Sequence, residues 1–413
     1  MAKRAAPARR KAAPRVKAAA GTGRRWRKIG LVMAASLALA LSLFLLIAPG
    51  MVERSMNRVE GSGLWRVDAA AKALHEDLTV VDLHADTLLW QRNLAKRSSR
   101  GHVDLPRLVE GNVALQVFAS VSKTPVGQNY DSNSADGDMV TPLVVAQAQP
   151  PRTWDSLLQR SLYHAEKLAE VERENPAQLM RVRSAADLDR LLARRANGEA
   201  VVGGLLAVEG LHDIEGRIAN LERLFDAGYR MAGLTHFFDN ELAGSMHGEA
   251  KGGLTPLGRQ AVRRMEALGM TVDLAHLSHK GVAEVLAMAK KPVVVSHGGA
   301  QKMCRVNRNL TDEEIRGVAE TGGIIGVGLW DGAVCAPTPQ ATARTMRYIR
   351  DLVGIDHVAL GSDFDGAVTA GLDASGLAAV TQALKDQGFS EREIRAAMGG
   401  NALALLRRNL PAR

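Results

Sequence analysis

The sequence predicts an α/β protein, a (β/α)8 TIM barrel that follows one N-terminal transmembrane helix. Three observations predict this architecture. Short β-branched runs alternate with helix signals, and this alternation favours a parallel sheet. Eight such runs follow residue 75, and eight is the strand number of a closed barrel. An uncharged stretch of 24 residues precedes them, whereas a bilayer core needs roughly 20 apolar residues in a helix.

The N-terminal region consists of a basic tail and an apolar segment. Residues 1–28 hold 11 of the 53 Lys and Arg and no Asp or Glu, so the rest of the chain carries 42 basic and 44 acidic side chains. The net charge of +9 therefore belongs to the tail, and attraction to a membrane surface explains it without a nucleic-acid partner. Residues 29–52 are uncharged, and the basic flank before them predicts a cytoplasmic tail with the body periplasmic or extracellular. A cleaved signal sequence is the alternative, although its apolar part would be shorter.

We expect a linker over residues 53–74 and the barrel over 75–413. Helix caps separate the predicted strands: Thr311 and Ser390 each begin a capping box, and Thr255 and Ser278 can cap two further helices. The eight predicted strands are residues 79–83, 113–118, 201–208, 231–235, 270–274, 292–296, 323–328 and 357–361.

A polar, turn-rich insertion at about 121–155 follows the second predicted strand. A loop of this length in a compact domain is usually functional or disordered. It would lie over the face where barrel active sites are found. A lid over the site and a plain mobile insertion both remain open. The two cysteines, Cys304 and Cys335, form no disulfide framework, so we expect free buried thiols, although a body outside the membrane could join them.

Ionisable side chains stand at the carboxyl ends of six of the eight predicted strands. Any one of them alone would more often be a structural residue, but together they would converge at the active-site end of a barrel. Seven such groups without counter-charge would resist burial, and divalent cations remove this cost because they accept imidazole and carboxylate ligands. The residues are His84, Asp86, Glu209, His236, His276, His297 and Asp363.

These residues predict a two-metal site. His84 and Asp86 lie on the same side of their strand and would hold one ion. Glu209 could bridge to a second ion held by His276 and His297. Two such ions clamp a hydroxide of lowered pKa between them, and this hydroxide is a nucleophile.

Five further residues are weaker candidates for the site. His102 and Asp104 precede the second strand, at the wrong end of the barrel, and are expected to be surface or turn residues. His212, His247 and His279 lie in loops near the expected site, where we expect them to be outside the ligand set or exposed to solvent.

The pattern resembles the membrane (renal-type) dipeptidases, peptidase family M19 of the amidohydrolase-like barrels. The resemblance spans about residues 75–410 and depends on 81–86 (VDLHAD), 207–210 (AVEG), 234–236 (LTH), 273–278 (DLAHLS), 295–300 (VSHGGA), 308–310 (RNL), 361–366 (GSDFDG) and 399–401 (GGN). It implies the same allocation of ligands to two zinc ions. It also implies that Arg308 pairs with the substrate carboxylate, that His236 binds the oxyanion, and that Asp363 holds the amino group and transfers the proton.

The expected function is therefore a zinc-dependent dipeptidase, with a metal-bridging hydroxide as nucleophile and Glu209, His236 and Asp363 as catalytic residues. The expected cofactors are two divalent cations, Zn²⁺ first among them, and the expected partners are a dipeptide and the membrane, with a homodimer left open. The insertion and residues 329–332 (LWDG) depart from the family pattern, and both are expected to border the pocket. One alternative is another amidohydrolase acting on a lactone, cyclic amide or acyl amino acid. The other is a non-catalytic binding barrel anchored in the envelope.

Overall fold

The computed structural model describes residues 1–14, 22–61 and 63–413. The chain divides into two units, Met1–Ile47 and Ala48–Arg413. Residues 15–21 of the predicted basic tail lie outside the described part. Residues 1–14 contain neither helix nor strand.

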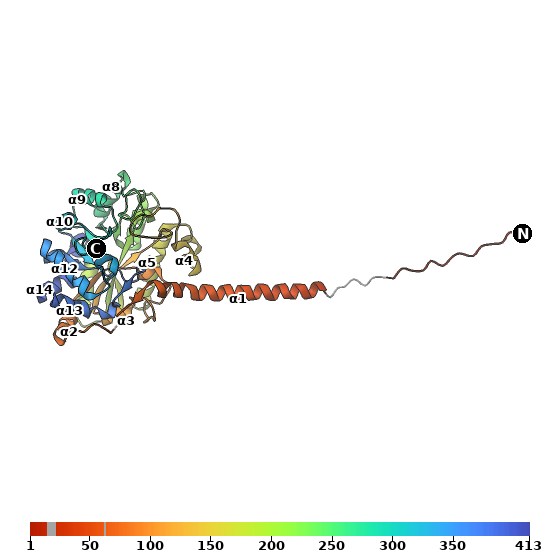
Figure 1. Ribbon diagram of the computed structural model, residues 1–413, viewed down its shortest axis with the longest axis horizontal. Coiled ribbons are helices and arrows are strands. Elements are labelled where there is room, and N and C mark those ends of the chain that lie inside the picture. The colour runs from red at the N-terminus through yellow and green to blue at the C-terminus, as the bar shows by residue number, and fades with distance from the viewer. Residues whose placement is uncertain (15–21, 62) are drawn as a thin grey trace. The chain divides into compact units, whose positions relative to one another are not determined.

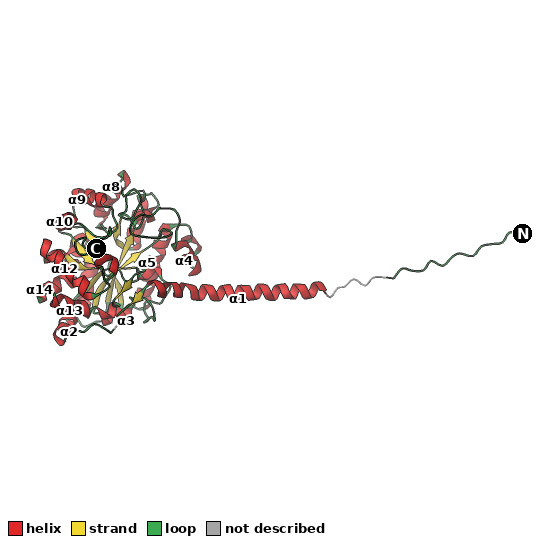
Figure 2. Cartoon of the chain, viewed as in Figure 1, coloured by secondary structure: helices red, strands yellow, loops and turns green. Residues whose placement is uncertain are grey.

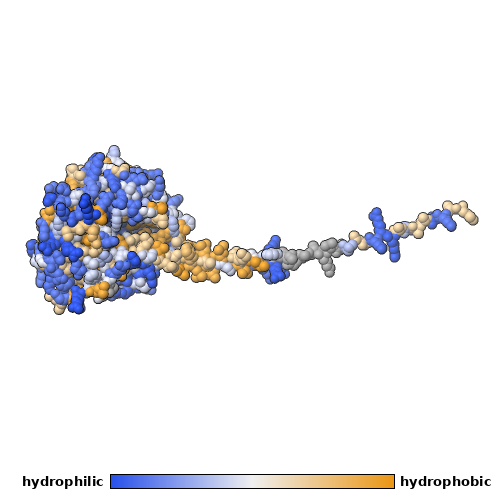
Figure 3. Space-filling view, viewed as in Figure 1, coloured by the Kyte–Doolittle hydropathy of each residue, from blue (hydrophilic) through white to orange (hydrophobic). Residues whose placement is uncertain are grey.

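Helix α1 (Thr22–Met56) contains the predicted membrane segment, residues 29–52, and extends beyond it at both ends, with Pro49 inside the helix. Its most apolar 18-residue window has a mean hydropathy of 2.6, and the apolar side chains are exposed, as the orange surface of α1 in Figure 3 shows. Among the described residues it is the one helix long and apolar enough to cross a membrane, a test that a signal sequence near an N-terminus also passes.

Eight parallel strands of the second unit close into a barrel, which confirms the predicted fold. Neighbours around it follow the order β2, β3, β5, β6, β7, β8, β9 and β10, and β10 pairs with β2. All eight predicted strands are present, as β2 (Val80–Ala85), β3 (Val113–Ser120), β5 (Val202–Glu209), β6 (Tyr229–Gly233), β7 (Thr271–Asp273), β8 (Val294–Gly298), β9 (Ile324–Val327) and β10 (Val358–Leu360). A short additional strand, β4 (Leu179–Arg181), pairs with the start of β5.

Helices surround the strands, as Figures 1 and 2 show. The longer ones are α2 (Ala69–Glu76), α5 (Leu157–Glu174), α6 (Ala185–Ala196), α7 (Ala219–Ala227), α8 (Pro256–Leu268), α9 (His279–Met288), α10 (Asp312–Glu320), α12 (Pro339–Val353), α13 (Ala378–Asp386) and α15 (Asn401–Asn409). Shorter helices are α3 (Leu105–Glu110), α4 (Val140–Ala146), α11 (Asp331–Val334) and α14 (Glu391–Arg395). The predicted caps are present, since Thr311 and Ser390 form capping boxes and Thr255 and Ser278 accept a backbone N–H.

Every residue of the barrel strands is buried, as expected for strands with a packed interior and a covering layer of helices. The GGN motif at residues 399–401, at the start of α15, packs closely against the barrel strands. A Cβ on Gly399 would lie 1.8 Å from the carbonyl oxygen of Thr79, so only glycine allows this approach. The Asn401 side-chain amide donates to the carbonyls of Ile355 (2.7 Å) and Val358 (2.8 Å) and so fixes the start of β10.

Candidate metal centre and active site

The structure brings all seven predicted ionisable residues together at the carboxyl ends of the strands, and all seven are buried. Each comes from its own strand end except for one pair, His84 on β2 and Asp86 directly after it. The others are Glu209 at the end of β5, His236 after β6, His276 after β7, His297 on β8 and Asp363 after β10. Three overlapping groups of these side chains offer ligand atoms within 4.8 Å of one another.

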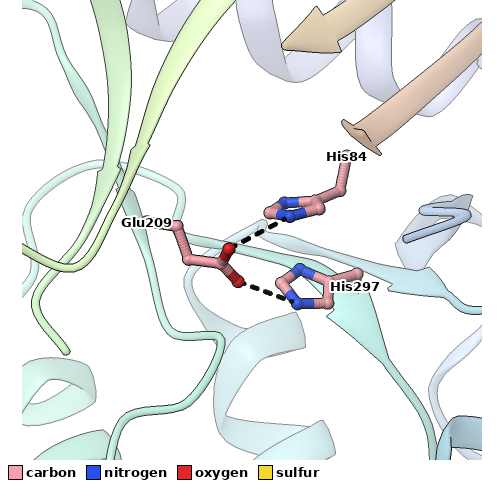
Figure 4. A group of neighbouring side chains, drawn as sticks. All are labelled: His84, Glu209 and His297. Carbon is pink, nitrogen blue, oxygen red and sulfur yellow. Dashed lines mark ion pairs between the residues drawn. The ribbon is translucent and has the colours of Figure 1, made fainter. Parts of the chain in front are cut away.

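The Glu209 carboxylate lies at the centre of this cluster. Its Oε1 atom lies 2.9 Å from His276 Nε2 and 3.3 Å from His297 Nε2. Its other oxygen, Oε2, lies 3.6 Å from the Nε2 atoms of both His84 and His236. Figure 4 shows His84 and His297 approaching different oxygens of the same carboxylate. One oxygen thus faces the histidines at the ends of β7 and β8, and the other lies between His84 of β2 and His236 after β6, an arrangement that a carboxylate bridging two cations could use.

Two buried polar atoms beside Glu209 lack a hydrogen bond. His84 Nε2 and Asp86 Oδ1 are 3.4 Å apart, and neither has a hydrogen-bond partner in the described part of the chain. On the other side, the Nε2 atoms of His276 and His297 approach to 3.1 Å. Buried polar atoms are nearly always paired, and nitrogen lone pairs turned toward one another repel unless a proton or a cation lies between them. The donor set therefore fits divalent cations.

The charges of the cluster also favour a cation. Burial lowers the pKa of His276 and of His297 well below the usual value, which keeps both imidazoles neutral and able to ligate. Burial opposes ionisation of Glu209, but His236, His84 and the hydrogen bonds of His276 and His297 outweigh it, so the pKa of Glu209 lies well below its usual value. Glu209 and Asp86 overcome the effect of burial on His84 and raise its pKa well above the usual value. The carboxylates thus draw positive charge to this position.

Two of the site residues have a positive φ, a backbone conformation that residues other than glycine rarely adopt. His276 has a φ of 63° and Asp363 a φ of 62°. Non-glycine residues with positive φ cost roughly 1–3 kcal/mol each and gather at functional sites. The turn after Glu209 uses a glycine for the same purpose, since Gly210 has a φ of 96°. These turns point the side chains into the barrel mouth.

Arg308 lies buried between His297 and an aromatic pair, Trp330 and Tyr130. Its Nη2 donates to the carbonyl of His297 at 2.6 Å, and its guanidinium lies 5.9 Å from the Trp330 ring. Trp330 Nε1 donates to the hydroxyl of Tyr130 at 3.0 Å. The guanidinium faces a cavity of about 600 Å³ whose lining also includes Glu209, His236 and Asp363. A charged fork at this place can bind a carboxylate.

The insertion after β3 forms one wall of this cavity, through residues such as Thr124, Asn129, Tyr130, Met139 and Leu143. The sequence predicts that the insertion and residues 329–332, which include Trp330, border the pocket, but it singles out neither Tyr130 nor Trp330 as a lining residue. No local pattern marks an aromatic residue in a polar loop as a pocket residue.

The expectation that His102 and Asp104 are surface or turn residues is wrong on exposure, because both are completely buried. Asp104 caps α3 by accepting the backbone N–H of Arg107. His102 Nδ1 accepts the backbone N–H of Asp365 at 3.0 Å, and Asp365 Oδ1 accepts the His102 backbone N–H at 2.6 Å. The segment that contains His102 therefore holds the loop after Asp363 in place through these two hydrogen bonds.

Asp365 belongs to a buried ion network that reaches α1. Its carboxylate pairs with Arg92 and accepts the hydroxyl of Thr87 at 2.8 Å. Arg92 Nε also lies 2.6 Å from Glu53, which Arg100 contacts at 2.5 Å. The segment predicted as a linker, residues 53–74, thus begins with a buried carboxylate and continues through β1 (Arg58–Val59), which pairs with β11 (Thr369–Ala370).

We predict that Asp365→Asn lowers the free energy of unfolding by about 3–5 kcal/mol at pH 7, because it leaves the Arg92 charge buried with one partner fewer. Arg92 and His102 outweigh burial and hold the pKa of Asp365 far below its usual value. The stabilisation is therefore complete above the unfolded-state pKa of about 3.9 and decreases as pH falls below it. Urea unfolding at pH 7 and pH 3 measures the difference between wild type and variant.

A matched control is Asp189→Asn, which breaks an exposed pair with Arg407 (2.9 Å) and should cost about 0–1 kcal/mol. A loss at Asp365 no larger than at Asp189, or one that persists unchanged at pH 3, would show that the network contributes no buried ion-pair energy.

The expectation of free thiols is also wrong, since Cys304 and Cys335 form a disulfide. The bond joins the loop that carries Arg308 to the end of α11, 31 residues along the chain.

Two of the three loop histidines, His212 and His279, lie outside the Glu209 cluster. His212 Nε2 contacts Ser122 Oγ at 2.9 Å, and His279 Nδ1 contacts Glu314 at 2.7 Å.

His247 lies beside the Glu209 cluster, near the site as predicted. Its ring stacks on Phe237 with centroids 4.6 Å apart and lies 5.3 Å from the ring of His276. Burial and the charge of Arg308 lower the pKa of His247 to about 3, so it is a neutral packing partner of Phe237 and His276.

Comparison with known proteins places this geometry in a family. Residues 68–410 match the family described as membrane dipeptidase (peptidase family M19). The dipeptidase aclJ of Aspergillus oryzae (strain ATCC 42149 / RIB 40) is 35% identical over 215 residues, which are 50% of this chain and 51% of that protein. The chain thus spans about half the length of aclJ. An uncharacterized dipeptidase of Schizosaccharomyces pombe (strain 972 / ATCC 24843) is 26% identical over 88% of each chain.

Solved structures agree. The metallopeptidase dipeptidase AC of family M19 is 25% identical, with a TM-score of 0.65 over 80% of this chain and 99% of its own. A metallopeptidase of Rhodobacter sphaeroides, solved with a phosphinate mimic of the dipeptide L-Ala-D-Ala, is 25% identical with a TM-score of 0.63 and the same coverage. The prediction of a metallodipeptidase is confirmed at the level of the family. Because the family model matches residues 68–410, which include the whole barrel, the chain belongs to the membrane dipeptidase family, peptidase family M19.

Proposed function

We propose that the chain is a zinc-dependent dipeptidase that binds two divalent cations on either side of Glu209. The observation that supports it most is the division of the Glu209 carboxylate, with Oε1 toward His276 and His297 and Oε2 toward His84. His84 and Asp86 would hold one cation, and His276 and His297 the other. Such a pair of cations, when bound, supplies an activated water at neutral pH and polarises the carbonyl of the scissile bond.

The chain's own residues would bind the two ends of the substrate and manage its charge. Arg308, after β8, binds the terminal carboxylate. Asp363, after β10, holds the amino group and transfers a proton to the leaving amine. Burial raises the pKa of Asp363 well above its usual value, a direction that suits a group that must accept and return a proton. His236, whose Nε2 lies 3.6 Å from Glu209, donates to the oxyanion.

We further propose that α1 anchors the enzyme in the cell membrane with the basic tail in the cytoplasm and the barrel outside. Eleven basic residues before the apolar segment support this orientation. The Cys304–Cys335 disulfide supports it independently, because disulfides persist mainly in oxidising compartments. Protease added to intact spheroplasts should degrade the barrel; full protection of the barrel would reverse the topology.

A substrate panel tests the proposed activity. The purified full-length chain is assayed on L,L and L,D dipeptides, lactones and acyl amino acids, and bound metal is measured on the same sample. We expect dipeptide hydrolysis with about two divalent ions per chain, its loss on chelation, and its return when Zn²⁺ is added back. Hydrolysis of lactones or acyl amino acids alone would favour another amidohydrolase activity. A metal-free chain without chelator-sensitive hydrolysis would favour a binding barrel.

A further inference from the structure

The cavity that holds the site has a second, apolar wall that the chemistry above does not use. It lies apart from Glu209 and the histidines of the site, and it consists of aliphatic and aromatic side chains from three separate segments. They are Val52 and Met56 on α1, Leu89 and Trp90 after β2, and Val140 and Leu143 on α4. A wall of this composition binds apolar groups and gives nothing to a charged one.

The wall borders the loop after Asp363. Trp90 Nε1 donates to the carbonyl of Asp365 at 2.7 Å. Next to Met56, the side-chain oxygen of Asn57 accepts the backbone N–H of Ala367 at 2.8 Å. By contrast, Arg308 lies beside His297 and Trp330, on the β8–β9 side of the mouth. The apolar wall therefore adjoins the end of the site that would hold the substrate amino group.

Packing and ion pairs hold the side chains of the apolar wall in place. Leu89, Trp90 and Val140 belong to one buried apolar cluster, and Leu143 packs against it. The end of α1 is fixed by Glu53, a buried carboxylate between Arg92 and Arg100. Val52 and Met56 remain 42% and 43% exposed, so a substrate side chain could cover apolar surface that the chain itself leaves uncovered.

We infer that these six side chains form a subsite for a large apolar side chain on the residue that carries the free amino group. The inference rests on the proposed dipeptidase function and narrows its substrate class to dipeptides that begin with residues such as leucine, methionine or phenylalanine. Two of the six, Val52 and Met56, precede the family-matched residues 68–410. The end of the N-terminal helix thus acts as part of the substrate site in this chain.

The test compares kcat/KM for Leu-Ala, Phe-Ala, Ala-Leu and Ala-Ala on the full-length chain in lipid nanodiscs. We expect a preference of at least about tenfold for Leu-Ala over Ala-Ala, since even one methylene in an apolar pocket is worth about that much. Met56→Ser and Leu143→Ser should each reduce this ratio severalfold. Matched controls are Met51→Ser and Val145→Ser, which alter exposed apolar residues on the same two helices outside the cavity lining and should leave the ratio unchanged.

The outcomes separate the subsite from the activity. Hydrolysis of Ala-Ala without a preference for Leu-Ala would overturn the subsite and leave the dipeptidase proposal standing. If the variants instead lower kcat/KM for Ala-Leu and not for Leu-Ala, the six side chains contact the carboxyl-terminal residue of the substrate. That result would also overturn the subsite proposal. The absence of hydrolysis on every dipeptide would overturn both proposals. Measuring the ratio in two variants on different helices guards against a folding defect in either one.

Discussion

Replacing Glu209 with glutamine should abolish metal binding and hydrolysis together. The substitution keeps the size of the side chain but removes the charge, and the amide nitrogen turns a donor toward one of the two ligand sets. Oε1 faces His276 and His297 whereas Oε2 faces His84, so either orientation of the amide disrupts one side. We expect kcat/KM to fall by about 10³-fold or more, because water without a bound cation has a pKa near 15.7 and is a poor nucleophile. Metal analysis and dipeptide kinetics on one preparation measure both effects.

Glu249→Gln is the matched control, since Glu249 is exposed in the loop after β6 and outside the cavity lining. It should retain both the metal and the activity. If the Glu209 variant instead keeps two ions at full activity, the carboxylate does not bridge them, and the proposed arrangement of the site is wrong.

Replacing Arg308 with alanine should raise KM for dipeptides by about 10²-fold while changing the hydrolysis of dipeptide amides much less. A bidentate guanidinium–carboxylate pair in a buried site is worth several kcal/mol, and an amide offers no charge to lose. Arg308 is 2% exposed and lies against His297, so its removal also costs some stability. A stability defect would affect both substrates equally, and the difference between them therefore isolates recognition of the carboxylate.

Two variants sharpen this prediction. Arg305→Ala removes an exposed arginine of the same loop and should leave both substrates unaffected. Arg308→Lys keeps a positive charge without the planar fork and should restore part of the selectivity for the free carboxylate. Equal effects of Arg308→Ala on dipeptides and their amides would show that Arg308 does not recognise the carboxylate.

Much of the fold and the cluster could be predicted from local sequence, because a parallel barrel ties position in the chain to position in space. Once the run at residues 201–208 is recognised as a strand, the residue after it must stand at the barrel mouth. The same reasoning predicts that His276 and His297 lie beside Glu209 and that Asp363 lies beside His84 and Asp86 at the barrel mouth, and the structure brings these groups together. The assignment of individual ligands and catalytic roles stays a prediction.

The remaining features depend on contacts between distant segments. Cys304 and Cys335 meet because two neighbouring strand-to-helix loops approach each other, which their spacing does not reveal. His102 was expected at the surface because it precedes a strand, yet a buried loop can run along the barrel if its polar groups find partners such as Asp365. Glu53 ends the uncharged stretch and suggested the start of a linker, whereas its arginine partners, Arg92 and Arg100, lie 39 and 47 residues farther along the chain.

The most direct test of the two-cation site is anomalous X-ray diffraction from crystals of the purified, metal-loaded chain. We predict two anomalous peaks roughly 3.5–4 Å apart at the mouth of the barrel, with one Glu209 oxygen on each. His84 and Asp86 should reach one peak, and His276 and His297 the other. Active crystals with no peak beside Glu209, or with this carboxylate turned away from the metal, would contradict the account.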